Sequence, residues 1–109
     1  MALTLQTAEV DIEAADVIGK VDFQAPDEST GSDANLIAAG IEAVSEGDFS
    51  ATSNATKLSF KTAASEVATE KMALSSAGNL TVTGTVTDVA GAIRAIPVNT
   101  EASTYSLVA

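Results

Sequence analysis

The chain has no cysteine, histidine or tryptophan among its 109 residues, and only one tyrosine and three phenylalanines. Without cysteine it can form no disulfide and no thiolate metal site, and without histidine it lacks the commonest metal ligand and general base. Large aromatic side chains bury about 150–250 Å² each, so their scarcity leaves little material for a monomeric core. Oligomerisation is one of the few ways left to stabilise so small a scaffold. We expect no cofactor, no metal and no catalytic residue.

Positive charge is also scarce, with five basic residues against fifteen acidic ones and a net charge of −10. Phosphate binding needs a basic face, so nucleic acid and an acidic membrane surface are not expected partners. No stretch approaches the ~18–20 apolar residues of a membrane span. The first sixteen residues lack the basic and apolar regions of a secretory signal, so we expect synthesis and assembly in a cytoplasm.

What the chain does have is a series of short stretches in which apolar and polar residues alternate. This period of two is typical of β-strands. Val21 and Phe23 are expected on one face of their strand, with Lys20 and Asp22 on the other. Seven or eight short strands at regular spacing predict an all-β fold. The clearest candidates are Met1–Val10, Val17–Phe23, Lys57–Thr62, Met72–Leu74, Leu80–Val86, Ile93–Val98 and Tyr105–Val108.

The stretch Leu36–Glu46 fits two structures equally well from its pattern alone. Its apolar residues can form one face of a helix, for which Asp33 is a candidate N-cap. The alternation Ile37, Ala39, Ile41 and Ala43 fits a strand just as well. Ala77–Asn79 is expected to be a turn, since glycine and asparagine accept positive φ.

The region from Asn54 to Asp88 carries the thin apolar row from which we predict the function. Each of its strands offers only two or three large apolar side chains on one side. Such a row cannot enclose a core by itself, and it needs the same row from another chain. The predicted intersubunit core residues are Leu58, Phe60, Met72, Leu74, Leu80, Val82 and Val86.

Other polar clusters are better explained as surface. The loop 27–35 has oxygen ligands and a glycine, but it lacks the order of acids that an EF-hand needs to bind Ca²⁺. Glu46 and Asp48 flank a glycine, and a carboxylate pair could serve a glycosidase, yet acids in a tight turn are usually surface charge. Glu70 and Lys71 are expected to form a charge pair at a strand edge.

The order of these segments resembles the repeated shaft modules of bacteriophage tail fibres and related virion fibre proteins. In that family an L-x-F-x-T strand is followed by a loop, an E-[KR]-M-x-[IL] strand, a small-Gly-Asn turn and a last strand. The matching residues here are Leu58, Phe60, Thr62, Glu70, Lys71, Met72, Leu74, Gly78, Asn79, Leu80 and Val82. The chain departs from many such modules after the turn, where it has Thr81–Thr85, TVTGT, instead of a G-I-G-T-x-x-P sequence.

The resemblance implies a parallel homotrimer, an intertwined β-prism or β-helix-like fibre module in which Leu36–Glu46 is a strand. It implies a non-enzymatic virion protein that attaches or spaces a host-recognition tip and contacts other tail or capsid proteins. We divide the chain into an N-terminal attachment segment (1–16), a β-rich fibre module (17–90) and a connector or start of a further module (91–109). The alternatives are a trimeric capsid decoration protein and a carbohydrate-binding adhesion module. The lack of tryptophan disfavours the second alternative, because sugar rings usually stack on aromatic side chains.

Overall fold

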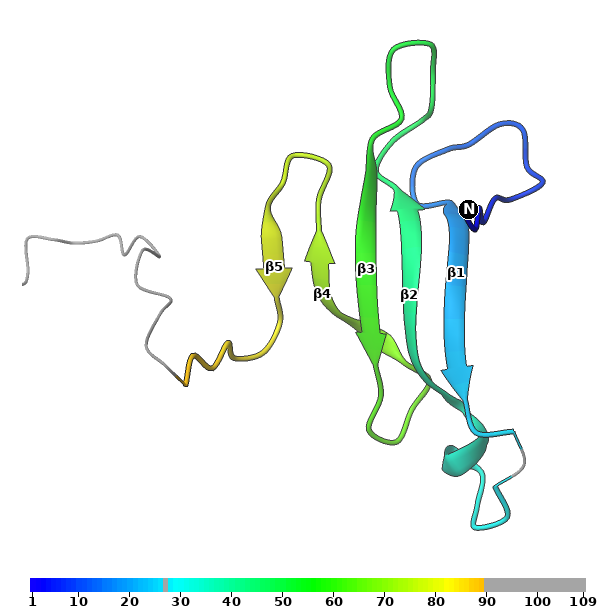
Figure 1. The fold of residues 1–109 in the computed structure, drawn as a ribbon, viewed down its shortest axis with the longest axis vertical. Coiled ribbons are helices and arrows are strands. Elements are labelled where there is room, and N and C mark those ends of the chain that lie inside the picture. Colours follow the sequence, from blue (N-terminus) through cyan, green and yellow to red (C-terminus); the bar gives the residue numbers. More distant parts are fainter. Residues whose placement is uncertain (27, 90–109) are drawn as a thin grey trace, which may run out of the picture.

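The computed structural model describes residues 1–26 and 28–89. Its centre is one antiparallel sheet of five strands, which lie side by side in chain order (Figure 1). The strands and the one 3₁₀ turn are β1 Val17–Gln24, η1 Asp33–Asn35, β2 Ile37–Ser45, β3 Thr56–Thr62, β4 Thr69–Leu74 and β5 Leu80–Val82. The prediction of an all-β chain is therefore confirmed.

The ambiguous stretch Leu36–Glu46 is a strand, because β2 occupies nearly all of it and pairs with β1 and β3. Gly40 is buried in the middle of β2. A Cβ atom at Gly40 would lie 3.0 Å from an Asp22 carboxylate oxygen and 3.1 Å from the Val21 carbonyl oxygen. The absence of a side chain at Gly40 thus permits the close approach of β1.

The pairing of the described strands has three irregularities: a shift between Phe23 and Gln24, an extra residue in β1 and an extra residue in β4. In β1, Val17 pairs with Val44 but Gly19 pairs with Ala43, so Ile18 is an extra residue. In β4, Met72 pairs with Phe60 on β3. The next pair is Glu70 with Lys61, so Lys71 is the extra residue of a β-bulge.

Two strand predictions are wrong in extent. Met1–Val10 is not a strand, and within the described residues no hydrogen bond joins residues 1–6 to any other residue. The predicted strand Leu80–Val86 ends at Val82, which pairs with Met72, because the next residue of β4 is Lys71, the extra residue of the bulge. The Thr83 N–H still donates to the Lys71 carbonyl, at 2.9 Å. The predicted strands Ile93–Val98 and Tyr105–Val108 lie outside the described residues.

The connections are loops and turns. The turn predicted at Ala77–Asn79 is confirmed, with Gly78 at φ 86°. The segment between β3 and β4 is a series of bends rather than a helical turn. The loop 46–55 between β2 and β3 forms a finger that projects from one end of the sheet (Figure 1).

Ser45 fastens the segment before β1 to the end of β2. Its side chain is 3% exposed, accepts a hydrogen bond from the Asp16 N–H at 2.9 Å and donates one to the Glu13 carbonyl. The backbone strengthens the link, because the Ala15 N–H donates to the Ser45 carbonyl at 3.0 Å. The residue that the sequence presents as one more small polar side chain is therefore a buried anchor.

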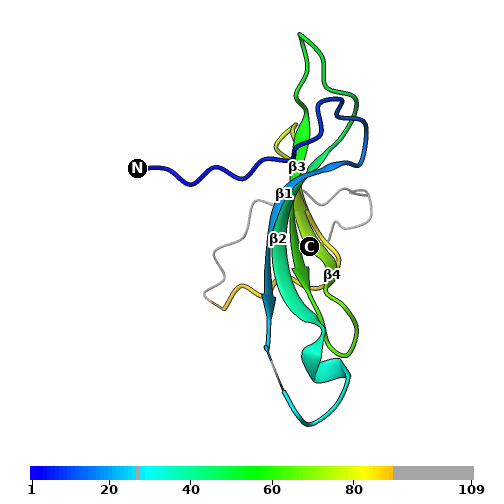
Figure 2. The same cartoon turned by 90° about the vertical axis from the view of Figure 1, so that its right-hand side faces the viewer.

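The sheet is a single layer, with no second sheet or helix packed on it among the described residues (Figure 2). The buried apolar residues there are two alanines, Ala68 and Ala73, and no large side chain is fully buried. In this part of the chain we also find no helix with the length and apolar character needed to cross a membrane.

Replacing Ser45 by alanine tests the anchor. Ser45→Ala leaves the Asp16 N–H and the Glu13 carbonyl without their side-chain partner, so we expect a loss of about 1–3 kcal/mol in the free energy of unfolding. Urea denaturation measures it, with the exposed Ser65→Ala as control. Equal midpoints for the two variants would contradict the anchor.

Candidate functional site

The register of the sheet aligns apolar side chains in rows that cross every strand. Residues directly opposite each other on antiparallel strands point to the same face. Val21 pairs with Ile41, Ile41 with Phe60, Phe60 with Met72, and Met72 with Val82. These five residues, one from each strand, form what we call the central row.

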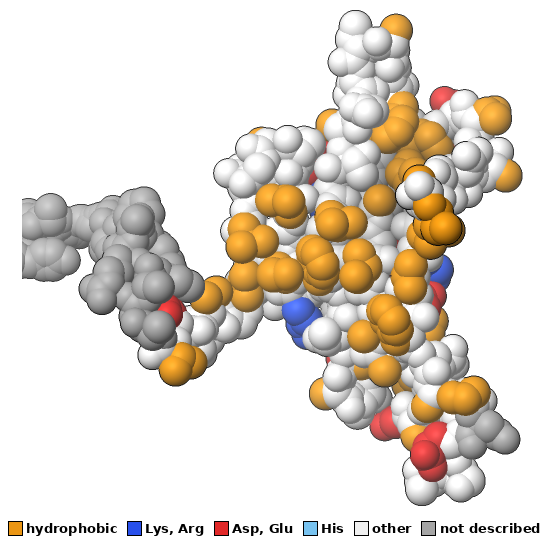
Figure 3. All heavy atoms as spheres, viewed as in Figure 1, with side chains coloured by type: hydrophobic (Ala, Val, Ile, Leu, Met, Phe, Trp, Pro, Cys, Tyr) orange, Lys and Arg blue, Asp and Glu red, His pale blue; other side chains and the backbone are white. Residues whose placement is uncertain are grey.

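A second row runs beside the first. Its members, joined by the same pairings, are Gly19, Ala43, Leu58, Leu74 and Leu80, and we call it the leucine row. The two rows, with Phe23 and Ala39 at one end, make up the apolar face. Figure 3 shows this face as a continuous area of hydrophobic side chains over the strands.

The apolar face is open to solvent in the single chain. Leu80 is 62% exposed and Phe23 is 53% exposed, while Leu58 is 39% exposed in the centre of the leucine row. A sheet normally buries one face against another layer of structure. Contiguous exposed apolar surface of this kind marks an interaction site.

Six of the seven predicted core residues lie on this face, and one does not. Val86 follows the end of β5 by four residues and is 55% exposed. The predicted set also omitted Val21 and Ile41 from the central row. Their alternation was visible in the sequence, but the register that joins them to Phe60 was not.

The opposite face of the sheet is polar and carries ion pairs. Lys61 on β3 reaches Glu42 on β2 at 2.7 Å, and Lys57 reaches Glu70 on β4 at 2.8 Å. Ser59 lies between the two lysines along β3 and is 2% exposed. The four charged residues and Ser59 contribute to the lining of a hollow of about 340 Å³. The sheet thus has one apolar and one charged side.

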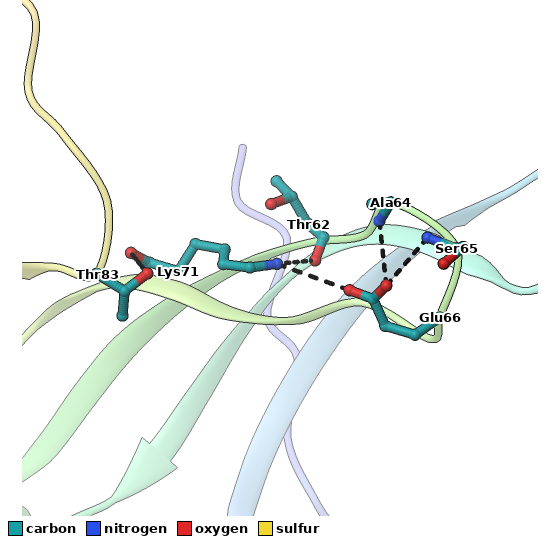
Figure 4. Close-up of polar contacts among 6 residues, drawn as sticks. All are labelled: Thr62, Ala64, Ser65, Glu66, Lys71 and Thr83. Carbon is teal, nitrogen blue, oxygen red and sulfur yellow. Dashed lines mark hydrogen bonds and ion pairs between the residues drawn. The ribbon is translucent and has the colours of Figure 1, made fainter.

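Glu70 and Lys71 do not pair with each other in the single chain, because Glu70 pairs with Lys57 on the charged face and Lys71 is the extra residue of the bulge. Lys71 turns to the loop after β3, where its ammonium donates to the Thr62 carbonyl at 2.7 Å and lies 3.9 Å from a Glu66 oxygen (Figure 4). Hydrogen bonds from the Ser65 and Ala64 N–H groups lower the pKa of the Glu66 carboxyl.

The other polar candidates take part in loop structure. Glu46 accepts hydrogen bonds from the Ser76 hydroxyl at 2.5 Å and the Ser76 N–H at 3.3 Å, which ties the loop after β2 to the turn after β4. In the loop after β1, the Asn35 side chain accepts from the Glu28 N–H and donates to the Glu28 carbonyl, both at 2.9 Å. Within residues 1–26 and 28–89, no three carboxylates gather as a metal site would require.

No protein-family model, curated protein or solved structure matches the chain. The proposed function therefore rests on the sheet, which has one apolar face and one charged face.

The Lys57–Glu70 pair predicts a pH dependence of stability. The Lys57 ammonium and, secondarily, the Ser59 hydroxyl hold the pKa of Glu70 below its ordinary value of 4.5. A carboxyl whose pKa falls on folding stabilises the folded state above the ordinary value, and this stabilisation is lost as the pH falls through the folded value. The Glu70 side chain is 37% exposed, so we expect less than about 1 kcal/mol.

Glu70→Gln should remove this contribution, so its stability should fall less than that of the natural chain as the pH drops below 4.5. Thermal unfolding between pH 3 and 7, roughly the range over which carboxyls titrate, measures the difference. Glu9→Gln, at an exposed position outside the sheet, is the control. Parallel pH profiles for Glu70→Gln and the natural chain would contradict the assignment.

Proposed function

We propose that the chain is a structural segment of a bacteriophage virion fibre, in which three parallel copies enclose a common core with their apolar faces. The observation that carries the proposal is the pair of apolar rows that cross all five strands, in which Val21, Ile41, Leu58, Leu74 and Leu80 are 39–62% exposed. The resemblance of the sequence to tail-fibre shaft modules supplies the number of chains and their direction.

A closed trimer would cover both the apolar face of the sheet and its two edge strands. Its apolar face would be covered by the other two sheets. Its edge strands, β1 and β5, each have one unpaired side in the described chain, and such edges invite aggregation. In a three-fold arrangement each interface is heterologous, so β1 of one copy would lie near β5 of the next and every edge would be covered.

The proposed role is mechanical. The charged face, with the Lys61–Glu42 and Lys57–Glu70 pairs, would point outward and remain in water. The fibre would attach or space a host-recognition tip, and its contacts would be with other proteins of the tail or capsid. No bond-making chemistry is needed for this function.

Substituting Leu80 tests the role of the apolar face. Leu80→Asp places a charge at the most exposed position of the leucine row, so we expect the oligomer to dissociate or aggregate. Thr81→Asp is the matched control, because Thr81 is the next residue of β5, is exposed, and points to the other face. Light scattering should give three times 10.9 kDa for the natural chain and for Thr81→Asp. A monomeric natural chain, or an unchanged trimer for Leu80→Asp, would contradict the proposal.

The number of copies per particle tests the place of the trimer in the virion. A tail fibre is present as a handful of trimers, whereas a decoration protein coats the capsid in hundreds of chains. Quantitative mass spectrometry of purified particles should find the low number. The high number would replace the fibre with a decoration protein while leaving the trimer intact.

A further inference from the structure

The segment Met1–Gln6, which we call the N-terminal arm, projects from the sheet on the side of the apolar face. In Figure 1 the arm points toward the viewer, on the face that Figure 3 displays. In Figure 2 it extends away from the sheet as an isolated segment. Met1 is 127% exposed and Leu3 is 85% exposed. No hydrogen bond within the described residues holds the arm.

The base of the arm is fixed by Leu5. Its Cβ atom would lie only 2.8 Å from a Cβ atom at Gly19, so the two residues are in close contact. Leu5 also borders a hollow of about 170 Å³ whose walls include Val21, Ile41 and Leu58 of the apolar face. Gly19 is the member of the leucine row that has no side chain, and Leu5 supplies an apolar side chain at that end of the row.

The sequence of the arm is that of a strand without a partner. Leu3 and Leu5 alternate with Thr4 and Gln6, the period of a strand with one apolar face. The sequence predicts a strand here, but residues 1–6 form no ladder with any strand of the described chain. Residues 1–8 also contain no charged side chain, although the whole chain has a net charge of −10. The arm therefore carries no side-chain charge that would repel a second copy.

We infer that the arm of one copy lies on the apolar face of the neighbouring copy, where Leu3 covers Leu74 and Leu80. This inference rests on the proposed trimer, because three-fold closure brings β1, and with it the arm, near β5 of the next copy. Leu80 is the most exposed member of the leucine row and lies at the end opposite to Gly19. The arm continues the leucine row of one chain into that of the next.

The reach of the arm agrees with this placement. An extended chain spans about 3.5 Å per residue, so Leu3 lies up to ~7 Å and Met1 up to ~14 Å from Leu5. Packed sheets are about 10 Å apart. An arm that is fixed at Leu5 therefore reaches the face of a neighbouring sheet.

The area also favours a contribution from the arm. The six most exposed members of the apolar face offer roughly 500 Å², on the basis of about 200 Å² for a large side chain. A standard interface buries about 800 Å² on each partner. Met1 and Leu3 add roughly 400 Å² on the same basis, which brings the total to the standard size. The six residues are Val21, Phe23, Ile41, Leu58, Leu74 and Leu80.

Disulfide trapping tests the inference. Because the natural chain has no cysteine, only the introduced cysteines can form a disulfide. Two full-length chains with tags of different size, one carrying Leu3→Cys and the other Leu80→Cys, are co-expressed, purified and oxidised. A disulfide between them joins two chains by construction, and it requires Cβ atoms about 3.5–4.5 Å apart. We expect the mixed disulfide to be at least about tenfold more abundant than in the controls, because only this pair meets that distance.

Two controls use cysteines of similar exposure in the wrong places. Leu3→Cys is paired with Thr81→Cys, which points to the other face, and Leu80→Cys is paired with Val10→Cys, which is exposed outside the arm. Circular dichroism checks that each variant folds. Where Leu80→Cys does not fold, Leu74→Cys on the neighbouring strand replaces it.

The outcomes separate the arm from the trimer. A trimeric natural chain whose Leu3–Leu80 cross-link does not exceed the controls overturns the arm inference and leaves the proposed function standing. A monomeric natural chain overturns both. In addition, Gly19→Val should displace Leu5 and lower the cross-link yield severalfold while the trimer persists, because the added side chain meets Leu5 within 2.8 Å. An unchanged yield would mean that Leu5 does not position the arm.

Discussion

A sheet that is one layer thick has to cover its apolar face with something outside itself, and this constraint governs the rest of the structure. Five strands expose two apolar rows, and the described part of the chain contains no second layer to cover them. The buried apolar residues of that part are two alanines, which contribute little hydrophobic stabilisation. In the proposed trimer, folding and assembly are therefore expected to be coupled, because most of the apolar area would become buried only between copies.

The division of charge between the two faces follows from the same constraint. Two lysine–glutamate pairs, Lys61–Glu42 and Lys57–Glu70, lie on the side of the sheet opposite the apolar face. Exposed pairs of this kind add little stability. The ion pairs instead determine which face of the sheet can be buried, since only the apolar face is free of them. The low aromatic content fits as well, because small and aliphatic residues allow several backbones to approach a common axis.

The period-two pattern was enough to predict the strands that have partners and the face on which Val21, Phe23, Leu58 and Phe60 lie. It could not reveal where a partner is lacking. Met1–Val10 has the pattern but forms no ladder with the free edge of β1, and β5 stops at Val82, where the bulge at Lys71 interrupts β4. The local pattern was also silent on Leu36–Glu46, where only pairing on both sides distinguishes a strand from a helix.

For the candidate site too, local alternation predicted some residues, and contacts between distant parts of the chain determined the others. Six of its residues could be selected from alternation alone, whereas Ile41 joins them through a register that depends on two neighbouring strands. Ser45 and Glu46 were missed as fastening points because their partners lie about thirty positions away in the chain. The residues next to Ser45 and Glu46 in the sequence do not indicate such contacts.

The extra residue in β4 has a consequence for how this sequence can change. Glu70 and Met72 are two positions apart and would share a face in a regular strand. The bulge at Lys71 reverses the alternation between them, so that Glu70 meets Lys61 while Met72 meets Phe60. Deletion of Lys71 would leave Glu70 opposite Lys61, whereas a regular strand that kept Lys71 would carry the Glu70 carboxylate onto the apolar face. The bulge at Lys71 thus keeps Glu70 on the charged face.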